Sequence, residues 1–168
     1  MNTHFDYIVV GAGSAGCVMA ARLSEDANIS VALIEAGGSD ASNWVTMPAG
    51  LIGTVPTKRM NWAFETVPQA GLNGRKGYQP RGKVMGGSSS INAMCYIRGH
   101  ASDYDAWEAE GCTGWSWNDV LPYFKKSEGN LAGLNNHLHG TKGPLKVSNH
   151  QSPSPFNEYF FKATAQRG

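Results

Sequence analysis

The sequence contains a glycine run whose residue types and spacing can bind a phosphate-containing ligand. Residues 11–16 read Gly-Ala-Gly-Ser-Ala-Gly and fit the pattern G-x-G-x-x-G. Gly11 permits a tight turn after a strand, Gly13 lets a pyrophosphate approach the backbone, and Gly16 lets the following helix pack closely. The free N–H groups at the N-terminus of that helix then attract the phosphates. The alternative is a strand–helix turn that binds nothing.

Glu35 makes the dinucleotide interpretation more specific. It follows Gly16 by nineteen residues, at the end of a second apolar run. A carboxylate there can accept hydrogen bonds from ribose hydroxyls and would repel a 2′-phosphate. The motif therefore predicts a dinucleotide site and disfavours NADP, but it does not choose between NAD and FAD.

A second run of small residues reads PRGKVMGGSSSIN from position 80 to 92. Two glycines followed by three serines bring backbone amides close to a polar or anionic group, and a helix is expected to begin near Ser88. So many small residues indicate a large, flat ligand that passes near the main chain. The alternative is a flexible loop, which the flanking Arg81 and Lys83 and the helical pattern after Ser90 disfavour.

The remaining candidates for chemistry are weaker. His100 follows the second run but is expected to be structural, and His137 and His139 lie two apart in a polar loop with no third ligand. The three cysteines are an odd number without paired spacing, which argues against disulfides and zinc. We therefore expect no catalytic residue and no metal site in this chain.

Strand and helix patterns place the first motif. Phe5–Val10 and Ile29–Ile34 are short apolar runs typical of buried strands, and Ala15–Asp26 has helical spacing. A strand, a helix and a strand with short connections predict a βαβ unit with a parallel pair.

The rest of the chain alternates loops with short elements. An extended excursion is expected from Gly37 to about Thr57 and a short strand at Trp62–Val67. Helices are predicted at Ser102–Glu110 with a Ser102 cap, at Asn118–Ser127, and from Ser154-Pro155 to about Ala165. A polar loop is expected at Gly129–Gly143. The aromatic residues between 107 and 124 are expected to be core.

Composition excludes several classes of protein. The chain has 168 residues, of which 41% are hydrophobic and 16% charged, with 21 glycines and a net charge of +1. Lysines and arginines are scattered, so no basic stripe predicts nucleic-acid binding. No run is long and apolar enough to span a membrane, and no signal peptide is recognisable. We expect a cytoplasmic protein, and peripheral association with the inner membrane stays open.

The second run and its continuation resemble the first signature of the glucose–methanol–choline (GMC) oxidoreductases. The match extends through AMCYIRGH, DYDAW, GWSW and VLPYFKKSE, and the opening FDYIVVGAGSAGCVMAARLSE, LIEAGG and NWAFETVPQ are also similar to this family. The resemblance covers nearly the whole chain. It implies an α/β fold, in which a Rossmann-like FAD-binding βαβ start carries helical and loop excursions, incomplete relative to the family fold.

The resemblance also implies FAD as cofactor and assigns residues to it. Residues 11, 13, 14, 15 and 16 would hold the pyrophosphate, Glu35 the ribose, and Trp62 would lie near the adenosine. Positions 86 to 94, and Asn92 especially, would follow the isoalloxazine. The full expected contact set is Gly11, Gly13, Ser14, Ala15, Gly16, Glu35, Ala36, Trp62, Arg81, Val84, Gly86, Gly87, Ser88, Asn92, Ala93 and Met94.

Two differences from the family limit this interpretation. Ile91 occupies the position where some relatives have a histidine that bonds to the flavin, so FAD is expected to be non-covalent. The family's catalytic histidine lies near the end of a much longer chain, so residues 1–168 are interpreted as the N-terminal part of the FAD-binding domain, with the substrate-domain excursion beginning near 131–168.

Two functions remain open. The chain is either the FAD-binding portion of an enzyme that oxidises a primary alcohol to an aldehyde, inactive alone, or a stand-alone, non-catalytic FAD-binding or interaction module. Its expected partners are an alcohol in the full-length protein and either the missing C-terminal polypeptide or another copy of itself. The sequence names neither the alcohol nor the electron acceptor, oxygen or quinone.

Overall fold

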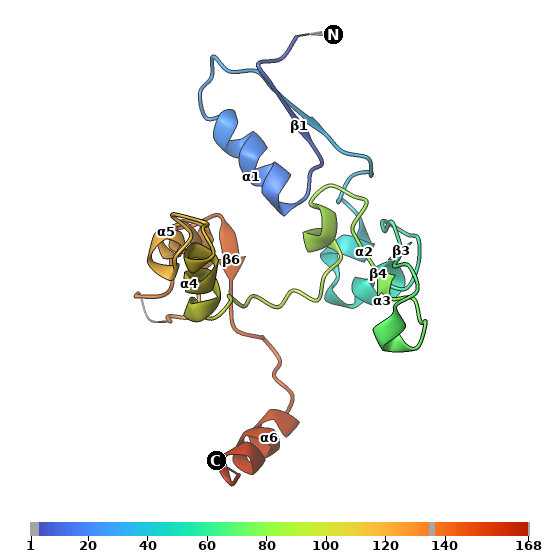
Figure 1. The fold of residues 1–168 in the computed structure, drawn as a ribbon, viewed down its shortest axis with the longest axis vertical. Helices are drawn as coiled ribbons and strands as arrows, with labels where there is room; N and C mark the ends of the chain where they lie inside the picture. The colour runs from blue at the N-terminus through green and yellow to red at the C-terminus, as the bar shows by residue number, and fades with distance from the viewer. Residues whose placement is uncertain (1–3, 135–136, 168) are drawn as a thin grey trace. The chain divides into compact units, whose positions relative to one another are not determined.

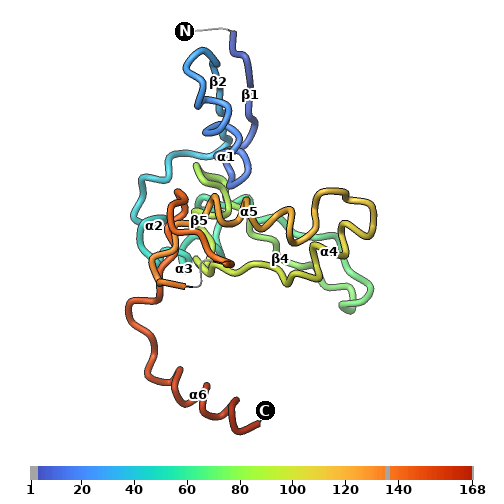
Figure 2. Tube along the Cα trace, turned by 90° about the vertical axis from the view of Figure 1, so that its left-hand side faces the viewer, coloured from blue at the N-terminus to red at the C-terminus, as the bar shows by residue number. Residues whose placement is uncertain are grey.

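The computed structural model describes residues 4–134 and 137–167, which form two compact units, Met1–Cys95 and Tyr96–Gly168. Each unit is a mixture of short helices, short strands and loops (Figures 1 and 2). Asn135 and Asn136 of the expected polar loop lie outside the described residues. No helix among the described residues is long and apolar enough to cross a membrane.

The first unit begins with the expected βαβ arrangement. Strand β1 (Tyr7–Val10) pairs in parallel with β2 (Val31–Ile34), and α1 (Ser14–Leu23) connects them and lies beside β1 in Figure 1. Both strands are two residues shorter than expected. Just before the paired residues, the N–H of Asp6 donates to the Ser30 hydroxyl oxygen and the N–H of Ser30 donates to the Asp6 carboxylate. The Ser30 hydroxyl, at 2.7 Å, and the Ser30 N–H both donate to the Asp6 carboxylate, and these two hydrogen bonds lower the pKa of Asp6. The outer faces of the strands are open, since Ile8 is 61% and Val10 81% exposed.

The expected extended excursion is wrong in part. It contains two one-turn helices, α2 (Asn43–Thr46) and α3 (Leu51–Thr54), with a 3-10 turn at Pro48–Gly50 between them. Ser42 provides the signal that the sequence analysis missed, because its hydroxyl caps α2 by accepting the backbone N–H of Trp44.

The next segment is organised by a buried asparagine. Strand β3 (Phe64–Glu65) pairs antiparallel with β4 (Tyr78–Gln79), so only the middle of the expected strand is regular. A 3-10 turn, Ala70–Leu72, lies between the strands. The Asn61 amide donates to the carbonyl of Val55 at 2.9 Å and to that of Thr57 at 3.0 Å. Its oxygen accepts the N–H of Arg81, which fixes the approach to the second glycine run.

The helix expected to begin near Ser88 is wrong. The chain forms a 3-10 turn, Gly87–Ser90, and then has no regular structure up to the next helix. The hydroxyls of Ser89 and Ser90 donate to the carbonyls of Gly86 and Met85, at 2.6 and 2.7 Å. These local bonds compete with a helical ladder. Positive φ angles at both glycines and at Met94 also prevent a continuous helix.

The described residues of the second unit form three helices and a parallel strand pair. Helix α4 (Ala101–Ala109) is capped by the His100 side chain, not by Ser102, and α5 (Trp117–Ser127) is capped by Ser116. Strand β5 (Glu128–Asn130) pairs with β6 (Leu145–Val147), so the expected polar loop begins as a strand. Helix α6 (Phe156–Ala165) ends where expected, with Pro155 as its N-cap.

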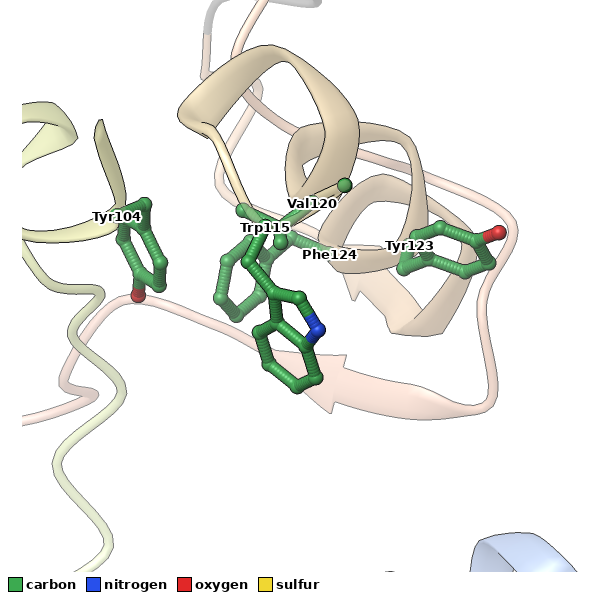
Figure 3. Close-up of a pocket in the computed structure, with 6 residues that line it drawn as sticks. Tyr104, Trp115, Val120, Tyr123 and Phe124 are labelled. Carbon is green, nitrogen blue, oxygen red and sulfur yellow. The ribbon is translucent and has the colours of Figure 1, made fainter. Parts of the chain in front are cut away.

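The expectation that the aromatic residues between 107 and 124 are core is wrong in part, because their rings contact one another but several of them, such as Trp115 and Tyr123 (Figure 3), are exposed. The rings of Trp107 and Tyr104 lie 5.4 Å apart and those of Tyr104 and Phe124 lie 5.7 Å apart. Trp115 is 54% exposed and Tyr123 is 72% exposed. The described residues bury few large side chains, and the apolar core consists of Ala12, Val84 and Ile91.

Candidate functional site

The first glycine run forms a tight turn between β1 and α1. Gly11 has a φ of +92°, and its N–H donates to the carbonyl of Ile34 at 2.7 Å. A Cβ on Gly16 would overlap the Gly11 carbonyl oxygen, so the helix packs on the turn only because this residue is glycine.

The start of α1 is open to an anion. Gly13 is the N-cap and supplies no side-chain hydrogen bond, and the first turn contains no acidic residue. The first N–H groups of a helix have no partner within it, and the dipole is positive at this end. Ser14 and Ala15 are the first two residues of α1, next to these N–H groups.

Glu35 lies just beyond β2, and its carboxylate joins two backbone segments. One oxygen accepts the N–H of Ala12 at 2.7 Å, and the other accepts the N–H of Gly37 at 2.9 Å. A carboxylate has about four acceptor sites, so two remain for ribose hydroxyls. The neighbouring Ala36 is exposed.

The backbone of Ala12 is the point where the two glycine runs meet. Its N–H is taken by Glu35, and its carbonyl accepts the N–H of Gly86 at 2.7 Å. A Cβ on Gly87 would lie 2.8 Å from the Cα of Gly13, so the two runs contact each other backbone to backbone. Ala12 itself is fully buried. The structure therefore brings together two motifs that are about 70 residues apart in the chain.

The rest of the second run attaches to the end of β2 and to Trp62. The N–H of Met85 donates to the carbonyl of Gly38 at 2.9 Å, beside a bridge between Gly38 and the buried Val84. The ammonium of Lys83 lies 4.3 Å from the Trp62 ring centre. The N–H of Trp62 donates to the carbonyl of Arg81 at 2.9 Å.

Asn92 ends the second run, and Ala93 and Met94 follow it. The Asn92 amide oxygen accepts the N–H of Met94 at 2.8 Å. Asn92 and Met94 line a cavity of about 150 Å³ together with Ser89, Ser90 and Ile91 of the second run and with residues 44–51. Ser88 remains with the second run, where its hydroxyl accepts the N–H of Gly82 at 3.1 Å.

Sequence reasoning missed three contributors, Ala12, Asn61 and Lys83. Ala12 occupies a variable position of the glycine pattern, and its role depends on its backbone, which no side-chain pattern reveals. Asn61 acts through long-range bonds to carbonyls. The sequence shows Lys83 as a cation next to the glycines, but it does not indicate that Lys83 contacts the ring of Trp62.

A family model for GMC oxidoreductase matches residues 5–168. The chain belongs to the GMC oxidoreductase family. Oxygen-dependent choline dehydrogenase from Vibrio vulnificus is 47% identical over the whole chain and over 30% of that protein. Alcohol dehydrogenase [acceptor] from Pseudomonas putida is 49% identical over 95% of the chain and 29% of that protein. This GMC chain therefore spans about 30% of the length of the curated relatives it matches.

Solved structures confirm the fold of this GMC chain. Pyridoxine 4-oxidase from Mesorbium loti has a TM-score of 0.87 at 38% identity, covering 98% of the chain and 32% of that protein. Formate oxidase from Aspergillus oryzae RIB40, studied for FAD modification, has a TM-score of 0.88 at 31% identity. The match covers 99% of the chain and 31% of that protein. The expected fold, an incomplete form of the family's α/β architecture, is confirmed.

A buried ionic cluster in the second unit of the GMC chain was not expected. Glu128 is fully buried and pairs with Arg98 and with Nδ1 of His139, the latter at 2.8 Å. Burial raises the pKa of Glu128, but hydrogen bonds from Asn130, His139 and the Gly140 N–H, with the charge of Arg98, lower it overall. His139, which the sequence places in a polar loop, thus has a buried ionic partner that the sequence did not indicate. Within the described residues no group of three His, Cys, Asp or Glu side chains could hold a metal ion.

Proposed function

We propose that this chain is the FAD-binding portion of a flavin-dependent oxidoreductase that acts on a primary alcohol. The observation that carries the proposal is the meeting of the two glycine runs and Glu35 at the Ala12 backbone, in a chain of the GMC oxidoreductase family. The names of the relatives, choline dehydrogenase and alcohol dehydrogenase, support an alcohol substrate.

The residues present fit the cofactor. The uncapped start of α1 suits a pyrophosphate, and Glu35 has acceptor capacity left for ribose hydroxyls. Trp62, already in contact with Lys83, offers an aromatic face near the adenosine end. The proposed contact set is Gly11, Gly13, Ser14, Ala15, Gly16, Glu35, Ala36, Trp62, Arg81, Val84, Gly86, Gly87, Ser88, Asn92, Ala93 and Met94. Asn92 to Met94 require the ligand to extend from the glycine runs to the cavity beside α2.

The cofactor would be held without a covalent bond. Ile91 is 5% exposed and lines the cavity beside α2 together with Asn92 and Met94. Its side chain is a hydrocarbon, so it offers no atom that could bond to the flavin.

The chain's share of the chemistry is to bind and orient. FAD, when bound, supplies the hydride acceptor at flavin N5, so that the alcohol carbon is oxidised to the aldehyde level. The hydroxyl proton needs a separate base, and we assign none to residues 1–168. We propose that residues 1–168 are the N-terminal part of the FAD-binding domain, that residues from about 131 begin the substrate-domain excursion, and that the base lies in further polypeptide.

A non-catalytic FAD-binding or interaction module is the second candidate. The observation that favours it is α6, where Phe156, Tyr159, Phe160 and Phe161 are each at least 65% exposed. Such a surface suits contact with polypeptide.

One anaerobic experiment separates the two functions. The intact gene product containing these residues is purified, and its flavin absorption is recorded before and after addition of choline or a medium-chain primary alcohol. Bleaching of the flavin bands is the expected result. Flavin bands that no alcohol bleaches would favour a non-catalytic FAD-binding module. A protein without flavin would contradict the oxidoreductase proposal and leave only the interaction module.

A further inference from the structure

The turn that precedes β3 contains strained backbone. Met60 and Ala63 have φ angles of +54° and +53°, in the left-handed region that residues with a Cβ seldom adopt. Trp62, the proposed adenosine contact, lies between them in the chain and is 41% exposed. Non-glycine residues keep such angles only where the surrounding structure holds them, and they gather at ligand-binding sites. We call residues 60–63 the Trp62 turn.

The side-chain oxygen of Asn61 holds one strained residue of the Trp62 turn. It accepts the N–H of Ala63 at 2.9 Å and the N–H of Arg81 at 2.9 Å. The Arg81 carbonyl in turn accepts the N–H of Trp62 at 2.9 Å. One amide oxygen therefore joins the turn to the start of the second glycine run.

The other strained residue is held by the second run itself. The carbonyl of Met60 accepts the N–H of Lys83 at 2.8 Å, and Asn61 and Gly82 form an antiparallel bridge. The ammonium of Lys83 lies over the Trp62 ring, 4.3 Å from its centre. The Trp62 turn and the start of the second run are thus fixed to each other by backbone and side-chain contacts.

The side-chain nitrogen of Asn61 anchors this arrangement from the opposite end of the amide. It donates to the carbonyls of Val55 and Thr57, at 2.9 and 3.0 Å, and to the hydroxyl oxygen of Tyr78 at 2.9 Å. Asn61 is only 3% exposed, so removal of its side chain leaves partners without a ready replacement from solvent. The nitrogen therefore anchors the side chain, and the oxygen holds the turn.

We propose that Asn61 is a positioning residue for FAD, which holds the strained Trp62 turn and the start of the second glycine run in the arrangement that the cofactor requires. The inference rests on the proposed function, because Trp62 and Arg81 belong to the proposed contact set. A site that already has its bound arrangement loses less conformational freedom when the ligand binds. Asn61 is itself buried, so it acts through these two residues and not by contact with the cofactor.

The first test is Asn61→Ala in the intact gene product containing these residues, prepared without flavin. Binding is followed by quenching of FAD fluorescence, with ADP as a competing ligand. The N–H groups of Ala63 and Arg81 lose their acceptor, so we expect the dissociation constant for FAD to rise about tenfold. ADP should lose a similar factor, because it carries the adenosine assigned to Trp62. Unchanged FAD affinity in a variant that circular dichroism shows to be folded would overturn the inference.

Tyr78→Phe is the matched control, because it removes a partner of the anchoring nitrogen and leaves the oxygen of Asn61 unchanged. The Tyr78 hydroxyl also donates to the carbonyl of Val55 at 2.6 Å, so the urea midpoint of unfolding should fall. Its affinity for FAD should match that of the wild type. If FAD affinity falls as much in Tyr78→Phe as in Asn61→Ala, Asn61 acts through stability alone and the inference is overturned.

Ala63→Gly separates positioning from loss of stability. Glycine adopts a positive φ without the steric cost that alanine has. In the wild-type background this change should leave FAD affinity unaltered, because Asn61 already holds the turn. In the Asn61→Ala background it should restore about three- to fivefold of the lost affinity. A double variant no better than Asn61→Ala would overturn the inference alone, whereas a wild type that binds no FAD would contradict the proposed function and the inference with it.

Discussion

Replacing Glu35 with glutamine changes the residue that joins the two sides of the proposed flavin site. The wild-type carboxylate accepts the N–H groups of Ala12 and Gly37. Glutamine keeps one acceptor oxygen, and its NH₂ group would face the other N–H. One charge-assisted bond is then lost, which costs about 1.5–3 kcal/mol. Because Glu35 is only half-buried, we expect the free energy of unfolding without FAD to fall by about 1–2 kcal/mol.

FAD affinity should fall further than stability does. The variant also loses the charge offered to the ribose hydroxyls, so we expect the dissociation constant to rise about tenfold or more. Urea unfolding of the flavin-free chain measures the first effect, and quenching of FAD fluorescence measures the second. Glu25→Gln is the control, because Glu25 is exposed. Among the described residues its ion-pair partner is the exposed Arg22. Unchanged stability together with unchanged FAD affinity would refute the role given to Glu35.

Three further predictions test other parts of the structure. Gly16→Ala should weaken FAD binding and lower the unfolding midpoint, because its Cβ overlaps the Gly11 carbonyl; a variant with normal binding would contradict the packing. Glu128→Gln should destabilise the second unit by about 3–5 kcal/mol at neutral pH. The folded-state pKa of Glu128 is lowered, so its stabilisation is present at neutral pH and lost as pH falls through that pKa, and the variant should lack this acid-dependent loss in pH-dependent unfolding. Finally, acid precipitation of the flavin-loaded parent protein should release the flavin into the supernatant, and flavin retained in the pellet would contradict non-covalent binding beside Ile91.

Local patterns predicted the start of the chain well. The glycine spacing, the apolar runs and Glu35 act over a few residues, so the βαβ unit and the open start of α1 could be read from the sequence. The helix expected from Ser88 was wrong because Ser89 and Ser90 bond back to nearby carbonyls. The positive φ angles at Gly86, Gly87 and Met94, which also oppose a helix there, could not be read from the sequence.

Long-range contacts could not be predicted in the same way. The meeting of the glycine runs at Ala12 depends on backbone atoms that every residue has, so no residue type signals it. The ionic cluster of Glu128 joins Arg98 to His139 across forty-one residues, and each partner alone resembles an ordinary surface charge. His100 caps α4 because its ring accepts the N–H of Ser102, a role more often taken by serine itself.

Binding of FAD to the purified, flavin-free chain tests the central claim most directly. The chain is titrated into FAD while flavin fluorescence is followed, with NAD as the comparison ligand and circular dichroism as the check on folding. We predict saturable binding of one FAD per chain that ADP competes away, because ADP carries the ribose and pyrophosphate recognised by Glu35 and the start of α1. A folded chain that binds NAD but not FAD, or that binds neither, would contradict the account.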